Sequence, residues 1–188
     1  MTARPSIWAV TCLLLVANIA LAEPAAQPSA GSRPANWARP LERPGVPNFY
    51  QVSETLYRGA QPTAGGLREL QKLGVKTVIN LRSLHSDNDL LPEGMGYVSI
   101  PMKAWHIEDE DMAQIVRLLQ DTDRLPAFIH CQHGSDRTGV ACAVYRMAVE
   151  GWTREEAISE MVDGGYGFWP RWGNIKQYLR TVELDDLR

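Results

Sequence analysis

The chain has 188 residues, of which 45% are apolar and 22% are charged, and its formal net charge at pH 7 is −3. A chain of this length and composition can build one good hydrophobic core, so we expect a single folded domain. No basic run stands out, so the chain lacks the electrostatic footprint of a nucleic-acid-binding protein. Nucleic acid is therefore excluded as an expected partner.

The first residues have the pattern of a secretory signal peptide. Arg4 precedes an apolar stretch at 7–21, and the small-residue motif Ala-Leu-Ala occupies 20–22. We expect residues 1–22 to be removed and the chain to be exported, to the periplasm or out of the cell, with no stable membrane insertion after cleavage. The apolar stretch is short for a spanning helix, which needs about 20 residues. An uncleaved membrane anchor is the alternative.

The composition of residues 23–47 predicts a linker, and the folded domain is expected to cover 48–188. The linker segment is rich in Pro, Ala, Ser and Arg and has no periodic apolar pattern. Beyond it, apolar runs with β-branched residues alternate with amphipathic stretches. The expected strands are 49–52, 55–58, 75–81, 97–102 and 126–130. The expected helices lie around 67–73, 112–119, 140–150, 153–163 and 174–182.

Local signals mark the ends of these helices. Gly74 follows the first helix, and Gly164 with Gly165 follows the fourth. Thr153 and Glu156 have the spacing of a capping box at the start of the fourth helix. Strands that alternate with helices predict an α/β fold, with a central, largely parallel sheet flanked by helices and a helical C-terminal part.

The segment between the last expected strand and the next helix carries the chemistry. It reads His-Cys-Gln-His-Gly-Ser-Asp-Arg-Thr-Gly over residues 130–139. A helix N-terminus offers free backbone N–H groups and the positive end of the helix dipole. The five residues between Cys131 and Arg137 let the chain wrap around one tetrahedral anion, with successive N–H groups turned inward as a nest. The sequence therefore predicts a site for a phosphate-like dianion.

The same groups predict a reactive cysteine. A thiolate at a helix N-terminus beside a guanidinium is favoured over the thiol, so we expect Cys131 to be ionised at neutral pH. Arg137 presents a planar fork for two phosphate oxygens. Thr138 can donate its hydroxyl to the sulfur, and Gly134 allows the backbone to approach the anion closely. His130 is expected to order the loop by hydrogen bonding.

This pattern resembles the signature of the protein tyrosine phosphatase superfamily, His-Cys-x5-Arg followed by Thr or Ser and then Gly, and every one of those positions matches. The resemblance covers 48–182 and is greatest to the compact bacterial dual-specificity phosphatases, including exported ones. It implies that Cys131 attacks phosphorus to form a phosphocysteine, which water then hydrolyses, while one general acid serves both steps. It also implies that no metal or other cofactor is needed, because the loop and Arg137 stabilise the charge.

The variable loop positions bear on the substrate. Gln132, His133 and Ser135 are expected to contact it, and the absence of Lys or Arg among the variable positions favours a single phosphomonoester over a polyanion. A phosphoprotein, with phosphotyrosine favoured over phosphoserine or phosphothreonine, is the expected partner. Two alternatives stay open. One is an inositol-phosphate or phosphoinositide phosphatase that uses the same site, and the other is a catalytically silent phosphate-binding module, which would be expected to have lost its cysteine or arginine.

The motif does not fix the general acid. Related phosphatases place an Asp in the loop that here spans 102–111, where Trp105 stands at the corresponding position. Asp109 is the preferred candidate in this loop, with Glu108 and His106 as rivals. Charge at a helix N-terminus explains the same acidic cluster equally well.

Asp136 is a second candidate for the general acid, because it lies within the loop directly before Arg137. Its alternative roles are to orient that arginine or to cap the helix by accepting backbone N–H groups. If Asp136 is the acid, a change at Asp109 should barely alter the rate.

Other features have competing interpretations. A zinc site made of His130, Cys131 and His133 lacks the usual ligand spacing, so no metal is expected. A sulfur-transfer enzyme would have a loop one residue shorter. Cys142 is expected to be a buried apolar residue, and the polar loop at 83–88 either rims the pocket or is merely solvated. Four aromatic residues are expected to pack the helical tail rather than a ligand: Trp152, Phe168, Trp169 and Trp172.

Overall fold

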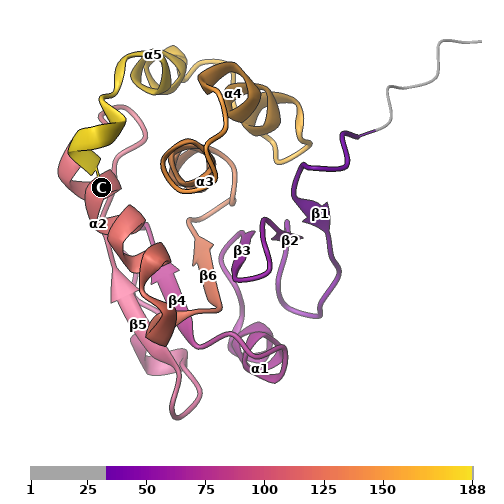
Figure 1. Ribbon diagram of the computed structural model, residues 1–188. Helices are drawn as coiled ribbons and strands as arrows, with labels where there is room; N and C mark the ends of the chain where they lie inside the picture. Colours follow the sequence, from indigo (N-terminus) through magenta and orange to yellow (C-terminus); the bar gives the residue numbers. More distant parts are fainter. Residues whose placement is uncertain (1–32, 188) are drawn as a thin grey trace, which may run out of the picture. The chain divides into compact units, whose positions relative to one another are not determined.

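A six-stranded sheet with the strand order β1-β2-β3-β6-β4-β5 lies at the centre of this computed structural model, which describes residues 33–187 (Figure 1). The predicted signal peptide and the first part of the predicted linker lie outside these residues. Strands β3, β6, β4 and β5 are mutually parallel, and β1 and β2 continue the sheet antiparallel. The strands are β1 (Arg39–Pro40), β2 (Tyr50–Gln51), β3 (Leu56–Gly59), β4 (Thr77–Asn80), β5 (Gly96–Ser99) and β6 (Ala127–His130).

The predicted fold class and the order of strands and helices are confirmed. Every residue of the three central strands is buried, as expected for parallel strands covered on both faces. The helices are α1 (Ala64–Lys72), α2 (Asp109–Gln120), α3 (Asp136–Ala148), α4 (Arg154–Asp163) and α5 (Gly173–Thr181), with short 3₁₀ turns η1 (Asn88–Leu90), η2 (Thr122–Arg124) and η3 (Leu184–Leu187). The predicted capping box of Thr153 and Glu156 is present at α4.

Successive residues of each central strand point into different cores, because side chains alternate across a sheet. In β6, Ile129 belongs to the larger core and Phe128 to the smaller one. Helix α1 covers the smaller core through Leu67 and Leu70, whereas α2, α3, α4 and α5 cover the larger one. Figure 1 shows α3 in the middle of this helical layer, where it lies against α2, α4 and α5.

The predicted linker is wrong for its described part, residues 33–47. Ala38 and Val46 are buried, with 1% and 4% of their surface exposed, and Arg39 pairs with Gln51 at the edge of the sheet. Proline suppresses helical periodicity, yet it is tolerated in an edge strand such as β1, where its missing N–H costs little. The domain therefore begins before Asn48. Within residues 33–187, no helix is both long and apolar enough to span a membrane.

A buried ion pair fastens this N-terminal segment to the helical layer. The carboxylate of Glu160, in α4, accepts two hydrogen bonds from the Arg146 guanidinium, from Nε at 2.8 Å and from NH2 at 3.0 Å. It also accepts a hydrogen bond from the backbone N–H of Ala38. Burial tends to raise the pKa of Glu160, but the guanidinium of Arg146 and the other donors lower it overall. The carboxylate therefore stabilises the fold above its ordinary pKa of 4.5, and this contribution is lost as the pH falls through the lowered value.

We expect Glu160→Gln to lower the free energy of unfolding by about 3–5 kcal/mol, because it leaves the Arg146 charge buried without its partner. Urea unfolding at pH 7 measures the change. The matched control is Glu155→Gln, which removes an exposed ion pair with Arg180 and should cost about 0–1 kcal/mol. Equal losses in the two variants would contradict this account.

Candidate active site

The site lies where the carboxyl ends of three parallel strands meet. His130, at the end of β6, is in register with Gly59 at the end of β3 and Asn80 at the end of β4. The chain then turns through residues 131–135 and enters α3 at Asp136. The predicted strand, loop and helix are thus present in the predicted order, with the loop at the N-terminus of α3.

Four consecutive backbone carbonyl groups of this loop, those of residues 131–134, each contact a nitrogen atom of another residue. The carbonyl of Cys131 faces Nδ1 of His130 at 3.1 Å, and the carbonyl of Gln132 accepts the backbone N–H of Gln61 at 3.2 Å. The next two carbonyls accept hydrogen bonds from side chains. Asn48 Nδ2 donates to the carbonyl of His133 at 2.8 Å, and Arg58 NH2 donates to the carbonyl of Gly134 at 2.8 Å. Because a trans peptide points its N–H opposite to its C=O, these contacts leave the loop N–H groups free to face the enclosed space.

Gly134 is required by backbone conformation and by space. Its φ is +72°, and a Cβ atom there would lie 2.5 Å from the carbonyl carbon of Gly59. The predicted close approach of this glycine to the anion stays a prediction. The close approach that the structure shows is to the end of β3.

Cys131 lies at the floor of the pocket with 3% of its surface exposed. Burial tends to raise its pKa, but the Thr138 hydroxyl and backbone N–H, the Arg137 charge and the Gly134 N–H together lower it. The Thr138 hydroxyl is fully buried and has no oxygen or nitrogen partner among the described residues, so it is available to the sulfur. These contacts favour a thiolate, as the sequence predicted.

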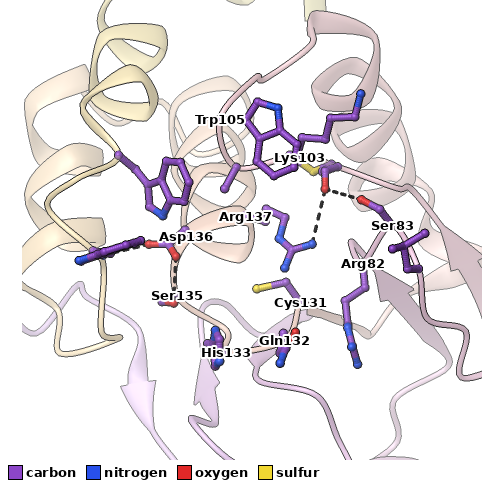
Figure 2. A pocket seen from close by; sticks show the side chains of 15 residues that line it. Arg82, Ser83, Lys103, Trp105, Cys131, Gln132, His133, Ser135, Asp136 and Arg137 are labelled. Atoms are coloured by element: carbon purple, nitrogen blue, oxygen red, sulfur yellow. Dashed lines mark hydrogen bonds between the residues drawn. The ribbon is translucent and has the colours of Figure 1, made fainter.

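Arg137 faces the cysteine across the pocket. Figure 2 shows its guanidinium directly above the Cys131 sulfur. NH1 donates to the carbonyl of Leu81 at 3.3 Å and to that of Met102 at 3.5 Å, so the loops after β4 and β5 fix the side chain. The rest of the fork remains available for an anion between the guanidinium and the sulfur.

The pocket around these two groups has a volume of about 420 Å³. Of the predicted substrate-binding residues, Gln132, His133 and Ser135 line it. Gly134 and Thr138 are not part of its wall. Its other lining residues come from the surrounding loops: Arg82, Ser83, Leu84, Met102, Lys103, Ala104, Trp105, Asp136, Trp169 and Trp172. Arg82 and Lys103 add positive charge that the loop sequence alone did not reveal.

Two of the C-terminal aromatic residues lie in the pocket wall, although Trp172 also packs against the larger core as expected. Trp169 and Trp172 form an edge-to-face pair with ring centroids 5.7 Å apart, and both line the pocket. Trp169 and Trp105 are 50% and 67% exposed, so aromatic surface borders the entrance. Trp152 and Phe168 are not in the wall, since Trp152 stacks on a guanidinium of α3 and Phe168 is buried.

The structure separates the candidate general acids. Asp136 lines the pocket, where its Oδ1 accepts the backbone N–H of Trp169 at 2.9 Å. Asp109, the preferred candidate, does not line the pocket, and its Oδ1 accepts the Tyr178 hydroxyl at 2.7 Å. Glu108 also lies outside the pocket wall. The preference for Asp109 is therefore not supported, because its helix position turns it toward α5.

His106, the remaining rival, also lies outside this pocket, and its Nε2 is 3.8 Å from a carboxylate oxygen of Glu108. His130 orders the loop through its contact with the Cys131 carbonyl, in agreement with the sequence analysis. Across residues 33–187, no three His, Cys, Asp or Glu side chains are grouped as metal ligands. Cys142 is a free, buried thiol inside α3, and burial raises its pKa to about 11.

Sequence reasoning missed the residues that hold the loop from outside. Four such residues, Asn48, Arg58, Gln61 and Asp87, lie between 44 and 83 positions before the nucleophile, and no local pattern connects them to it. A polar residue inside an otherwise apolar strand, such as Arg58 in β3, is the one signal that was available. Asn48 has a positive φ of +52°, which is uncommon for a residue other than glycine, but this feature is visible only in the structure.

A cysteine with a lowered pKa beneath a guanidinium, at a strand-to-helix turn beside a largely parallel sheet, is the arrangement of a cysteine-dependent phosphatase. A family model described as "DSP-PTPase phosphatase fused to NAD+ Kinase" matches residues 35–165. The chain is also 38% identical over 168 residues to the dual specificity protein phosphatase TpbA of Pseudomonas aeruginosa, which covers 87% of this chain and 74% of that protein. It therefore belongs to the dual-specificity phosphatase family.

Solved structures agree with this assignment. The crystal structure of P. aeruginosa TpbA has a TM-score of 0.74 and 35% sequence identity, covering 84% of this chain and 97% of that one. A cysteine-to-serine variant of TpbA in complex with pTyr has a TM-score of 0.73 at 34% identity, covering 84% and 96%. The catalytic core of the PP-IP phosphatase SIW14 from S. cerevisiae shares the fold, with a TM-score of 0.67 at 18% identity over 76% and 90% of the two chains.

We expect Gly134→Ala to abolish binding of inorganic phosphate, because the added Cβ would collide with the end of β3 and displace the loop N–H groups. Isothermal titration measures the binding. Gly151→Ala is the matched control, since Gly151 also has a positive φ, of +73°, but no atom within 4 Å of the added Cβ. It should destabilise the fold by about 1–2 kcal/mol and leave binding unchanged. Equal loss of phosphate binding in both variants would refute the steric argument.

Proposed function

We propose that this phosphatase hydrolyses phosphotyrosine in proteins, with Cys131 as the nucleophile and Arg137 as the phosphate clamp. The observation that carries the proposal is the position of the Cys131 sulfur, at the floor of a pocket and beneath the Arg137 guanidinium (Figure 2). The tryptophan-bordered entrance supports an aromatic ester, because an aryl group can pack against Trp105 and Trp169. The similarity to a TpbA structure that contains pTyr adds further support.

In the proposed first step, the Cys131 thiolate attacks phosphorus and the bond from phosphorus to the tyrosine oxygen breaks. Arg137 and the loop N–H groups stabilise the negative charge of the phosphoryl group as it is transferred. The leaving oxygen takes a proton from the general acid. Water then attacks the phosphocysteine, its proton goes to the same carboxylate, and the sulfur leaves as a thiolate that the Thr138 hydroxyl stabilises.

We assign the general acid to Asp136. Within residues 33–187, Asp136 is the one carboxylate that lines the pocket. Its Oδ1 accepts the Trp169 backbone N–H, which leaves Oδ2. Oδ2 has only a weak contact, at 3.5 Å, with the Ser135 hydroxyl. This oxygen is therefore available to hold the proton that the leaving group needs.

A second candidate function is hydrolysis of an inositol phosphate. Arg82 and Lys103 place positive charge in the pocket beyond the phosphate loop, which favours a substrate with a second anionic group. The inositol diphosphatase DSP5 of Arabidopsis thaliana is 28% identical to the chain, over 61% of this chain and 60% of that protein. The exposed tryptophans at the entrance, Trp105 and Trp169, give phosphotyrosine the preference.

We also propose that the chain is exported and works outside the cytoplasm. The support is the Arg4, apolar stretch and Ala-Leu-Ala pattern of residues 1–22.

Cys131→Ser should abolish hydrolysis of a phosphotyrosine peptide in a buffer that contains a metal chelator, because serine is a far weaker nucleophile at neutral pH. Release of inorganic phosphate measures the rate for the parent and the variant. Cys142→Ser is the control and should retain the parent rate, because Cys142 does not line the pocket. Hydrolysis by the Cys131 variant near the parent rate would refute the covalent mechanism.

The same assay with an inositol polyphosphate and with a phosphoserine peptide identifies the substrate class. We expect the phosphotyrosine peptide to have the highest kcat/KM and Trp169→Ala to lower that value more than it lowers the value for phosphoserine. A clear preference for the inositol polyphosphate, reduced by Arg82→Gln, would select the second candidate function instead.

Asp136→Asn should lower kcat by about 10²–10⁴-fold and remove the fall of kcat at high pH, because the variant has no carboxylic acid to lose its proton. The pH profile of kcat on an aryl phosphate measures both effects. Asp109→Asn is the control and should keep the parent profile. A profile that loses its basic limb only in the Asp109 variant would transfer the role to that residue.

Fractionation of cells that express the full chain tests the export proposal. We expect the protein outside the cytoplasm, shortened by the 22 residues up to Ala22. Full-length chain in the cytosol would contradict it.

A further inference from the structure

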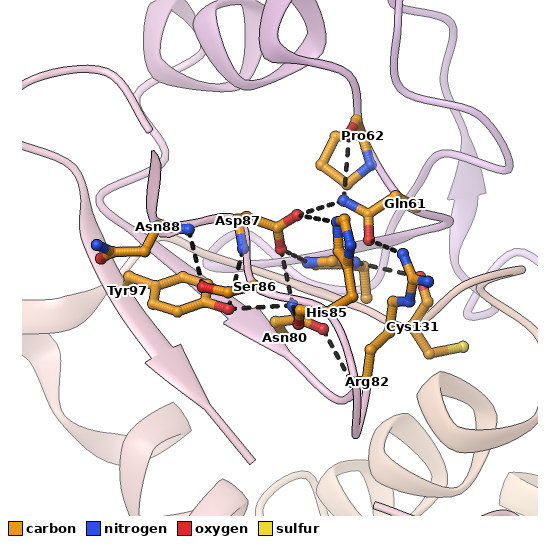
Figure 3. Close-up of polar contacts among 11 residues, drawn as sticks. Gln61, Pro62, Asn80, Arg82, His85, Ser86, Asp87, Asn88, Tyr97 and Cys131 are labelled. Carbon is orange, nitrogen blue, oxygen red and sulfur yellow. Dashed lines mark hydrogen bonds and ion pairs between the residues drawn. The ribbon is translucent and has the colours of Figure 1, made fainter. Parts of the chain in front are cut away.

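One buried tyrosine connects two of the residues that hold the phosphate loop. The second of the four loop carbonyls accepts Gln61, which also donates to the buried carboxylate of Asp87 (Figure 3). The third and fourth carbonyls accept Asn48 and Arg58. Both of these donors also contact Tyr166, a buried residue in the segment between α4 and α5. Tyr166 therefore joins the residues that hold the second half of the loop.

The position of the Arg58 guanidinium depends on the Tyr166 ring. Arg58 is buried, its Cζ lies 3.7 Å from the ring centroid, and its NH2 donates to the Gly134 carbonyl at 2.8 Å. None of the ion pairs within residues 33–187 includes Arg58, and its Nε has no hydrogen-bond partner there. A buried cation needs a compensating partner, and the negative face of an aromatic ring provides one. The ring therefore holds this guanidinium against the loop.

Asn48 links the Tyr166 backbone directly to the loop. Its Nδ2 donates to the carbonyl of His133 at 2.8 Å and to the carbonyl of Tyr166 at 2.9 Å. A side-chain amide nitrogen has two N–H groups, so it can serve both acceptors. The Gly134 N–H belongs to the same peptide group as the His133 carbonyl, and it is one of the donors that lower the pKa of Cys131. The bridge therefore orients a donor of the site.

Tyr166 is itself fixed by contacts with three other side chains. Its hydroxyl donates to Glu160 at 3.0 Å and accepts NH2 of Arg33 at 2.7 Å. Its ring meets Tyr50 edge to face, with the centroids 4.7 Å apart. These contacts join Tyr166 to the buried ion pair that fastens the N-terminal segment to the helical layer. The tyrosine is thus a fixed support for the residues that contact it.

We propose that Tyr166 is a positioning residue of the phosphate loop, which it holds in its anion-binding conformation through Arg58 and Asn48. The proposal rests on the proposed function only in that phosphate is the group bound. Tyr166 does not line the pocket, so it acts through the peptide groups that these two donors hold. Its ring and its backbone carbonyl support the loop, whereas its hydroxyl contributes to the stability of the fold.

Two substitutions separate the ring from the hydroxyl. Tyr166→Leu removes both, whereas Tyr166→Phe keeps the ring against Arg58 and removes the hydrogen bonds to Glu160 and Arg33. Both should lower the free energy of unfolding, measured with urea. We expect Tyr166→Leu to raise the Kd for inorganic phosphate by about tenfold or more, the effect of one lost hydrogen bond to a charged group. Tyr166→Phe should keep the parent Kd, and isothermal titration at pH 7 measures both values.

Trp152→Leu is the matched control, because it also removes a ring from a buried guanidinium. Trp152 lies over Arg146, with Cζ 4.2 Å from the ring centroid. The hydrogen bonds of Arg146 go to two glutamates and to the carbonyl of Asn36 rather than to the phosphate loop. The control should therefore lose stability and keep the parent Kd. A parent Kd in Tyr166→Leu, or equal weakening in the control, would overturn the proposal.

The pH dependence of Cys131 alkylation provides a second readout that needs no substrate. Iodoacetamide reacts with the thiolate, so the rate follows the population of that form. A displaced Gly134 N–H no longer stabilises the thiolate, so Tyr166→Leu should raise the pH of half-maximal alkylation. Tyr166→Phe and Trp152→Leu should keep the parent midpoint. An unshifted midpoint in Tyr166→Leu would contradict the proposal.

Asn48→Gly covers the case in which Tyr166→Leu does not fold. Glycine adopts the positive φ of this position, +52°, without strain, but it lacks the amide that bridges the two carbonyls. We expect the Kd for inorganic phosphate to rise by about tenfold, and a Kd equal to that of the parent would refute the bridge. Failure of the proposed function would appear differently, as phosphate binding by the parent chain without hydrolysis of a phosphotyrosine peptide.

Discussion

The site depends on the outward orientation of four consecutive peptide groups. The carbonyls of residues 131–134 are each held by a donor, which leaves the opposite N–H groups directed toward the anion site. Burial by itself raises the pKa of Cys131, and the Thr138 hydroxyl and N–H, the Arg137 charge and the Gly134 N–H in the loop lower it overall. The phosphate cradle is therefore a consequence of one backbone conformation, and the start of α3 adds the Thr138 and Arg137 groups that lower the pKa of the nucleophile.

The fold provides the donors because parallel strands end together. Gly59, Asn80 and His130 are in register at the same edge of the sheet, so the segments that follow β3, β4 and β6 converge on the loop. A polar cluster at this depth is stable only if its members satisfy one another. In the cluster around Asp87, Asn80 and Gln61 donate to the buried carboxylate, and Gln61 also accepts a hydrogen bond from Arg82, a residue of the pocket wall.

The features that the sequence predicted are set by neighbouring residues, and the features that it missed depend on contacts between distant segments. Capping residues, buried strands and the segment at 130–139 are contiguous patterns, and each sets the conformation of its own segment. The Asn48 contact with the loop and the turn of Asp109 toward Tyr178 depend on how separate segments pack, which no short pattern encodes. Residues 33–47 were misassigned for the same reason, since an edge strand needs only a neighbour to pair with.

A crystal structure of the chain with bound tungstate, a tetraoxo dianion that mimics phosphate, tests the central claim most directly. The account predicts an anion directly above the Cys131 sulfur, bound by the backbone N–H groups of the loop and by Nε and NH2 of Arg137. An anion bound elsewhere, or a loop carbonyl turned toward it, would contradict the account.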